Sequence, residues 1–82
     1  MALTYKIKDF AIAGSDVSVG FQITDDSDGQ IFVIDKTVAK GDKTDNAIVE
    51  EAQAAAQTEI DEWVASRANV GKTWDPTYKT LS

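Results

Sequence analysis

The 82-residue chain contains no cysteine and no histidine. Without cysteine it has no disulfide, no thiolate nucleophile and no thiolate zinc ligand. Without histidine it has no imidazole base and no histidine pH switch. These absences exclude most of the common catalytic chemistries. The missing cysteine also leaves the redox compartment unassigned, because such a chain is equally compatible with reducing and oxidising surroundings.

Basic residues and long apolar runs are also scarce. The chain has 8 Lys and Arg against 14 Asp and Glu, which gives a formal net charge of −6. Because the basic residues are scattered rather than gathered in a stripe, the sequence argues against nucleic acid and anionic membrane surfaces as partners. No apolar run approaches the roughly 18 residues of a membrane span, and residues 1–6 lack the regions of a signal peptide. We therefore expect synthesis and folding in the cytosol.

The chain does contain enough apolar sequence for one small core. Hydrophobic residues make up 43% of the chain and charged residues 27%, which is the composition of an ordinary globular protein. A chain of this length accommodates one domain, near the size at which a hydrophobic core suffices without disulfides or metals. We predict a single small α+β domain over residues 1–82.

The clearest pattern in the sequence is a long helix over residues 45–68, around which the rest of the chain is arranged. Thr44 or Asp45 is the expected N-cap, because both side chains can accept hydrogen bonds from the first turn. At about 100° per residue, the apolar side chains of the helix fall within one broad arc. They are Ile48, Val49, Ala52, Ala55, Ala56, Ile60 and Trp63.

The end of this helix is expected at residues 69–71. Asn69 or Gly71 would adopt the left-handed conformation, with Val70 as the accompanying hydrophobic contact. The helix would be about 36 Å long, whereas eight-residue strands span about 27 Å. The helix should therefore overhang the sheet, and its overhanging end, with Trp63 or Ile48, should need cover from the C-terminal tail or a neighbouring subunit.

Three stretches of alternating apolar and polar residues precede the helix and predict three strands. They cover residues 3–13, 17–24 and 30–38. In the first strand the alternation breaks at Asp9-Phe10, so either a bulge re-aims the chain or the strand ends there and Phe10 packs inward. The Asp28-Gly29 pair predicts a hairpin with φ > 0 at both turn positions. The simplest assembly is a three-stranded antiparallel meander with the helix on one face and a short extended C-terminal tail, in the order β-β-β-α.

Several apolar side chains are candidates for contacts with another chain. The third strand is apolar on both faces through residues 31–34, so the face away from the helix needs cover from the tail or from another chain. The alanines of the helix favour helix formation and would also let a second helix approach closely. Aromatic residues on a terminal arm either cap the core or anchor an interface. The candidate interface residues are Phe32, Ile34, Trp63, Val70, Trp74 and Tyr78.

The acidic turn between the second and third strands offers a candidate cation site. Aligned with an EF-hand loop, Thr24, Asp26, Asp28 and Asp35 fall at oxygen-donor positions and Gly29 at the glycine position. The first position lacks aspartate, the last lacks the bidentate glutamate, and the flanking segments are strands. A solvated hairpin turn is therefore the preferred interpretation. Asp26, Asp28 and Asp35 are the candidate metal ligands, and we expect no cofactor.

Glu59 projects into the apolar arc of the helix. An unpaired buried carboxylate is costly or takes up a proton, so Glu59 needs a partner if it is buried. The side chains that could supply one are Lys6, Lys8, Lys36, Tyr5 and Tyr78. A carboxyl group with a raised pKa can act as a general acid, but no second catalytic group accompanies it at a defined spacing. Structural pairing or an intersubunit contact is therefore preferred over catalysis.

The segments from residue 25 onward are an acidic Asp-Gly hairpin, an apolar strand, an alanine-rich helix that closes in residues 59–63, and the closing residues Gly71, Trp74, Asp75 and Pro76. In this order of segments the chain resembles small virion proteins of tailed bacteriophages. The closing residues look like the Gly-x-x-Tyr/Trp-Asn/Asp-Pro segments of short tail and tail-fibre-associated proteins. The resemblance implies a structural component that makes symmetric protein contacts within a tail or head, without a cofactor.

The leading hypothesis is thus a non-enzymatic structural protein of a phage particle. Its partners would be other virion proteins or copies of itself, rather than nucleic acid, a membrane or a small-molecule substrate, and it would be located in the virion after synthesis in the host cytoplasm. One alternative is a small acidic regulatory or inhibitory protein that binds a basic site on a host protein. Another is a small enzyme that uses Glu59 with an acidic partner.

Overall fold

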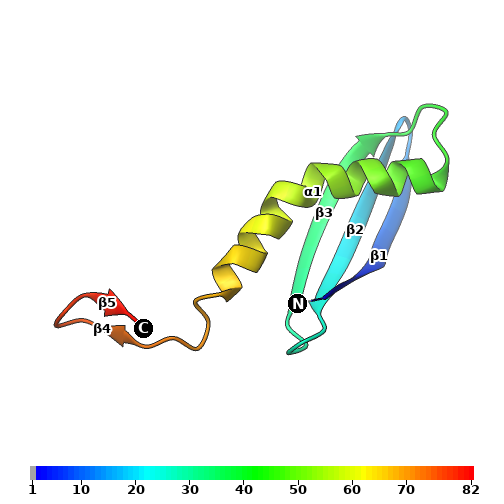
Figure 1. Ribbon diagram of the computed structural model, residues 1–82. Coiled ribbons are helices and arrows are strands. Elements are labelled where there is room, and N and C mark those ends of the chain that lie inside the picture. Colours follow the sequence, from blue (N-terminus) through cyan, green and yellow to red (C-terminus); the bar gives the residue numbers. More distant parts are fainter. Residues whose placement is uncertain (1) are drawn as a thin grey trace.

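The computed structural model describes residues 2–82 and is shown in Figure 1. Three antiparallel strands are followed by one long helix and a two-stranded C-terminal hairpin, so the predicted α+β class and the β-β-β-α order are confirmed. The elements are β1 (Leu3–Ala13), β2 (Asp16–Asp25), β3 (Ile31–Ala39), α1 (Asp45–Arg67), β4 (Trp74–Asp75) and β5 (Thr80–Leu81). Within residues 2–82, no helix combines the length and the apolarity that crossing a membrane would take.

Strand β2 lies at the centre of the sheet, between β1 and β3. Between Ile7 and Asp9 the pairing of β1 with β2 shifts by one residue, so a β-bulge accounts for the broken alternation in the sequence. Phe10 pairs with Val19, and Ile7 pairs with Phe21. Because directly opposed residues share a face of the sheet, the bulge keeps the apolar side chains on both sides of it on the same face.

The connection between β2 and β3 covers residues 26–30, one residue later than the predicted turn at residues 25–29. Gly29 has a φ of +75°, whereas Asp28 does not have a positive φ, so the expectation for Asp28 is wrong. The carbonyl oxygen of Asp25 accepts the backbone N–H of Gly29 at 2.8 Å, and Asp25 donates to the carbonyl of Gln30 at 2.9 Å. These bonds close an acidic loop whose carboxylates bind side chains of β1 and α1.

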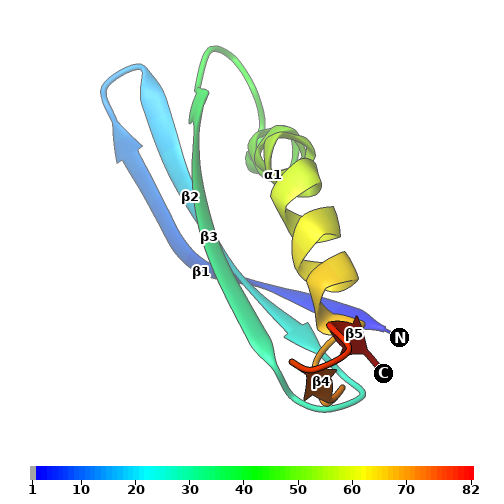
Figure 2. The same cartoon turned by 90° about the vertical axis from the view of Figure 1, so that its left-hand side faces the viewer.

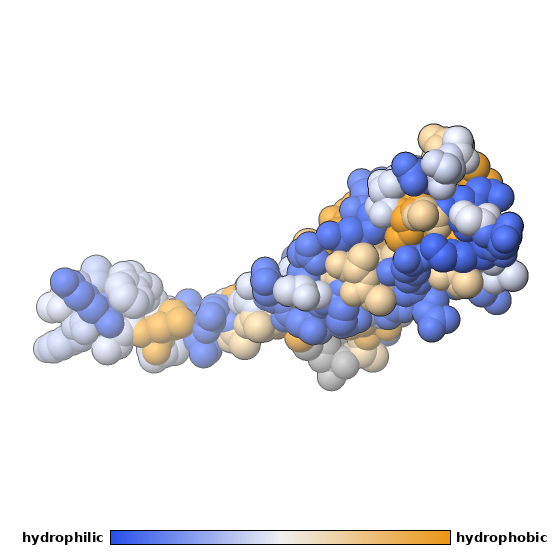
Figure 3. All heavy atoms as spheres, turned by 90° about the horizontal axis from the view of Figure 1, so that it is seen from above, coloured by the Kyte–Doolittle hydropathy of each residue, from blue (hydrophilic) through white to orange (hydrophobic). Residues whose placement is uncertain are grey.

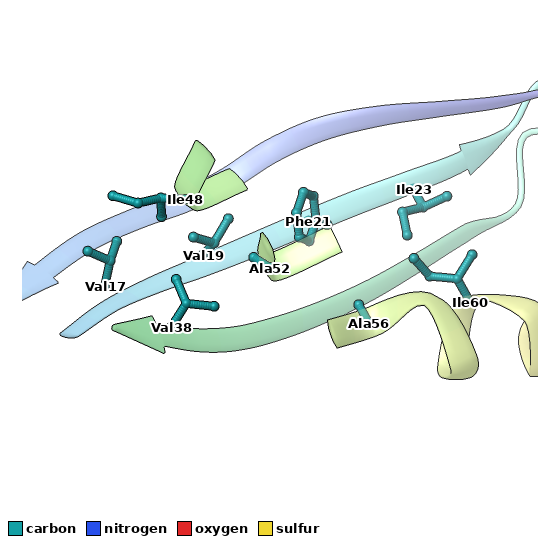
Figure 4. Packing of buried hydrophobic residues seen from close by; sticks show 9 residues of the cluster. All are labelled: Val17, Val19, Phe21, Ile23, Val38, Ile48, Ala52, Ala56 and Ile60. Atoms are coloured by element: carbon teal, nitrogen blue, oxygen red, sulfur yellow. The ribbon is translucent and has the colours of Figure 1, made fainter. Parts of the chain in front are cut away.

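Helix α1 lies across one face of the sheet (Figure 2). The hydroxyl of Thr44 accepts the N–H of Ala47 at 3.2 Å, which makes Thr44 the N-cap. Residues at every fourth position of the helix are buried against the sheet, and their alanines bring the helix backbone close to it. The core shown in Figure 4 consists of Val17, Val19, Phe21, Ile23, Val38, Ile48, Ala52, Ala56 and Ile60.

The ends of the helix are covered by the chain itself. Ile48 is buried in the core at one end. Near the other end, Trp63 stacks on Phe32 of β3 with ring centroids 5.4 Å apart. The helix ends at Arg67 with Ala68 as its C-cap, and Gly71 has a φ of +91°, but Val70 is exposed and makes no hydrophobic cap. The strands are 9 to 11 residues long rather than eight, and Arg67 in the last helical turn contacts Asp25 at the end of β2. The expected need for cover from the tail or a neighbouring subunit at Ile48 or Trp63 is therefore corrected.

The C-terminal arm, residues 69–82, is a small hairpin rather than an extended tail. Trp74 pairs with Leu81 across β4 and β5, and the Asp75 carboxylate accepts the N–H groups of Thr77 and Tyr78 in the turn. Within the described residues, β4 and β5 contact only each other among the strands and helix. The arm projects away from the body in Figure 1, and the molecule is 57 Å long but 22 Å and 15 Å across. The chain's own tail does not complete the cover of the helix.

Two isoleucines provide a matched test of this core. Ile60 is 1% exposed, whereas Ile31 is 52% exposed. Ile60→Ala should lower the free energy of unfolding by about 2–5 kcal/mol, because it leaves a cavity between helix and sheet. Ile31→Ala should change it by less than about 0.5 kcal/mol. Urea unfolding followed by circular dichroism measures both, and equal losses in the two variants would contradict the assigned packing.

Candidate functional site

Strand β1 carries an uncovered apolar surface of the sheet. Helix α1 packs on β3 and β2, and its described residues make no close approach to β1. Four β1 side chains on the helix side of the sheet are therefore 37% to 57% exposed. We call this set, Tyr5, Ile7, Phe10 and Ile12, the β1 stripe. The edge of the Tyr5 ring contacts the Phe21 ring, with centroids 6.5 Å apart, so the stripe continues the core rather than standing apart from it.

The C-terminal arm carries a second uncovered apolar surface. Trp74 and Leu81 are cross-strand partners, so their side chains leave the hairpin on the same face. They are 57% and 46% exposed, and Tyr78 in the turn between them is 78% exposed. Figure 3 shows the arm as a narrow extension that is mostly blue or pale on the hydropathy scale, with one orange group at its surface. Of the predicted interface residues, Val70, Trp74 and Tyr78 are thus all at free surface.

The other three predicted interface residues lie elsewhere. Phe32, Ile34 and Trp63 are partly buried and packed against the core on the helix side of the sheet. On β3 the alternate residues Ile31 and Val33 point to the face away from the helix and are about half exposed. The sequence correctly predicted that this strand is apolar on both faces. The uncovered face carries Ile31 and Val33 rather than Phe32 and Ile34.

The sequence did not reveal the β1 stripe, because the alternation in β1 is the same as that of a strand whose apolar face is buried. Comparing the width of one helix with the width of a three-stranded sheet would have revealed it. A helix with its side chains is about 10 Å across, and strands lie about 4.8 Å apart, so one helix covers about two strands. In a three-stranded sheet with one helix, the apolar face of an edge strand remains uncovered.

Arg67 fixes the C-terminal end of α1 to the acidic loop. Its Nε donates to Oδ2 of the buried Asp25 at 3.3 Å, and its Nη2 donates to a carboxylate oxygen of Asp28. Its guanidinium also lies 5.4 Å from the ring centroid of Trp63. An open hollow of about 250 Å³ beside this cluster is lined by Asp25, Ser27, Asp28, Val64, Arg67 and Ala68. Local sequence patterns do not reveal this ion pair, because it joins residues that are 42 and 39 positions apart in the chain.

Hydrogen bonds keep Asp25 ionised in spite of its burial. The backbone N–H and hydroxyl of Ser27 both donate to Oδ1 of Asp25, at 2.9 Å and 2.6 Å. These bonds, and then the Arg67 guanidinium, hold the pKa of Asp25 below its ordinary value and outweigh the opposing effect of burial. The carboxylate is therefore an internal charge partner rather than an acid.

The predicted cation ligands do not converge. The Asp26 carboxylate accepts the hydroxyl of Thr4 at 2.9 Å, and the Asp28 carboxylate is taken by Arg67. Asp35 pairs with Gly20 along the strand and lies on the face of the sheet away from the helix. Within residues 2–82, no three acidic side chains lie close enough together to hold a metal ion. The loop instead uses its carboxylates to bind β1 and α1.

Glu59 has found its partner in Lys36 of β3, one of the five candidates from the sequence. The Lys36 ammonium donates to Oε1 at 2.8 Å, while Oε2 is buried without a hydrogen-bond partner. The hydrogen bond from Lys36 lowers the pKa of Glu59 below its ordinary value. A general acid needs the opposite shift, so this environment gives no support to acid catalysis by Glu59.

No protein-family model, no curated protein and no solved structure matches this chain. The interpretation of the two apolar surfaces therefore rests on their own geometry and chemistry.

Asp25 predicts an acid-sensitive contribution to stability. Because its pKa is lower in the folded chain than in the unfolded chain, its contribution is complete above the unfolded value of about 4 and is lost as the pH falls through the folded value. Asp25→Asn should therefore be less stable than the wild type at pH 7 and should lose less stability on acidification below about pH 4. Thermal unfolding between pH 2 and pH 7 measures this. Asp16→Asn, at an exposed position in the same strand, is the control and should keep the wild-type acid sensitivity.

Lys36→Met should raise the pKa of Glu59, because it removes the hydrogen bond that favours the ionised form. The side-chain carboxyl shift of Glu59, followed by NMR during a pH titration, measures this change. Lys40→Met removes a lysine from the loop beyond β3 and should leave the Glu59 titration unchanged. A wild-type Glu59 that titrates above its ordinary value would contradict the assigned pairing.

Proposed function

We propose that this chain is a non-enzymatic structural protein of a tailed bacteriophage particle, which assembles with copies of itself and with other virion proteins through symmetric contacts. The observation that carries the proposal is the pair of uncovered apolar surfaces, the β1 stripe and the C-terminal arm. Monomeric proteins rarely leave large apolar patches in water, and such patches mark protein contacts.

The arm supports an assembly role through its construction. Trp74 and Tyr78 are the side-chain types that dominate the binding energy of protein interfaces, and both lie on a short hairpin away from the body. The Asp75 carboxylate, which accepts two backbone N–H groups, stiffens the turn. A preformed arm loses less conformational entropy on binding than a disordered one, and it is therefore suited to contacts between subunits.

The resemblance to phage proteins supports the same role. The residues that carry it, Gly71 and the Trp74-Asp75-Pro76 segment, build the arm: Gly71 has a φ of +91° where the chain leaves the helix, and Trp74 and Asp75 form β4. The shared segment therefore has a structural task in this chain, since it shapes and directs the arm.

Two measurements test the proposal. Size-exclusion chromatography with light scattering, over a wide range of protein concentrations, should show species larger than the monomer that grow with concentration. Mass spectrometry of purified particles of the phage that encodes the chain should find it at a fixed stoichiometry, whereas a cytosolic enzyme of that phage, as a control, should be absent. A strict monomer that is missing from the particles would refute the proposal.

A further inference from the structure

We infer that the C-terminal arm of one copy docks on the β1 stripe of a second copy, with Trp74 and Leu81 packed over Ile7, Phe10 and Ile12. The inference rests on the proposed function only in that the chain assembles with copies of itself. The two surfaces are the main uncovered apolar surfaces of the helix side and of the C-terminal end. Each would remove the other from water, and the burial of apolar area drives such association.

The arm cannot cover the whole stripe of its own chain. Arg67 ties the end of α1 to Asp25, and Asp25 pairs with Leu3 at the beginning of β1. Ile12 lies nine residues further along this strand, a distance of about 30 Å. Trp74 follows Ala68 by six residues, which span at most about 20 Å. The far end of the stripe, where Phe10 and Ile12 are exposed, is therefore available to the arm of another copy.

The charges of the two parts favour the same contact. The arm carries Lys72 and Lys79 against one acidic residue, Asp75, whereas residues 1–68 carry 6 basic and 13 acidic residues. A slightly cationic arm is attracted over long range to the acidic body of a second copy, whereas two bodies repel each other. Strand β1 itself carries Lys6 and Lys8 against Asp9, so the attraction brings the copies together and the apolar side chains make the contact.

The contact joins two different patches of the same chain, so it is heterologous. Two copies that exchange arms reciprocally form a closed dimer, and copies that pass the arm onward form a ring or a filament. Either arrangement leaves each copy with one donor surface and one acceptor surface, which can be disabled separately.

The test uses full-length chains with one surface disabled. In Trp74→Glu the arm is defective but the stripe is intact, and in Ile7→Glu the stripe is defective but the arm is intact. Each substitution should weaken self-association by roughly 30-fold or more, the effect of losing a hot-spot residue. Val33→Glu is the matched control, since Val33 is exposed to a similar degree on the opposite face, and it should associate like the wild type. Analytical ultracentrifugation gives the dissociation constants.

A mixture of the two defective variants gives the decisive result. Trp74→Glu still offers the stripe and Ile7→Glu still offers the arm, so an equimolar mixture should form a 1:1 complex that neither variant forms alone. Complex formation also shows that both variants are folded, and Ile12→Glu replaces Ile7→Glu if circular dichroism shows that the latter is unfolded.

Three outcomes would overturn the inference: a monomeric wild type, variants that assemble as the wild type does, or a mixture that remains monomeric. Failure of the proposed function is distinguishable, because it appears as absence from phage particles, whatever the arm does in solution.

Discussion

The fold depends on one contact, the seam between helix α1 and the sheet strands β2 and β3. Four helix residues at every fourth position, Ile48, Ala52, Ala56 and Ile60, form the core together with the alternating face of β2 and with Val38 of β3. The two alanines in the middle let the helix backbone approach the sheet, mainly at β3, and the two isoleucines fill the space at either end. Because an 82-residue domain has little apolar area to bury, this seam is its main source of hydrophobic stabilisation.

The same seam determines which surfaces remain free. A helix that packs mainly on β3 and also on β2 cannot cover β1 as well, yet β1 keeps apolar side chains on the helix side over its whole length. The bulge near Asp9 is what maintains this, since regular pairing of the same sequence without a bulge would turn Phe10 and Ile12 to the opposite face. Strand β1 is therefore built to present an apolar surface, in contrast to an edge strand that is protected by charged residues on both faces.

The sequence predicted the elements well because local patterns determine them. Alternation defined the strands, a 3.6-residue period defined the helix, and Thr44 marked its beginning. The site was harder to predict because it depends on the relation between elements. Periodicity shows that Ile7 and Phe32 each belong to an apolar face, but not that the helix lies over Phe32 and leaves Ile7 uncovered. The hairpin in the arm was likewise missed, since β4 and β5 are two residues each and have no detectable period.

The acidic loop connects these two aspects of the structure. Its aspartates suggest a cation site in the sequence, and in the fold the cation is the guanidinium of Arg67, held by Asp25 and Asp28 and backed by Trp63. A guanidinium in this position does more than neutralise the loop. It holds the last turn of α1 against the loop, and the arm begins two residues after Arg67. Removing one partner of such a pair leaves an uncompensated buried charge, so the aspartates of the loop and Arg67 depend on each other. The charge pattern that resembles a metal site thus holds the end of the helix from which the arm leaves the body.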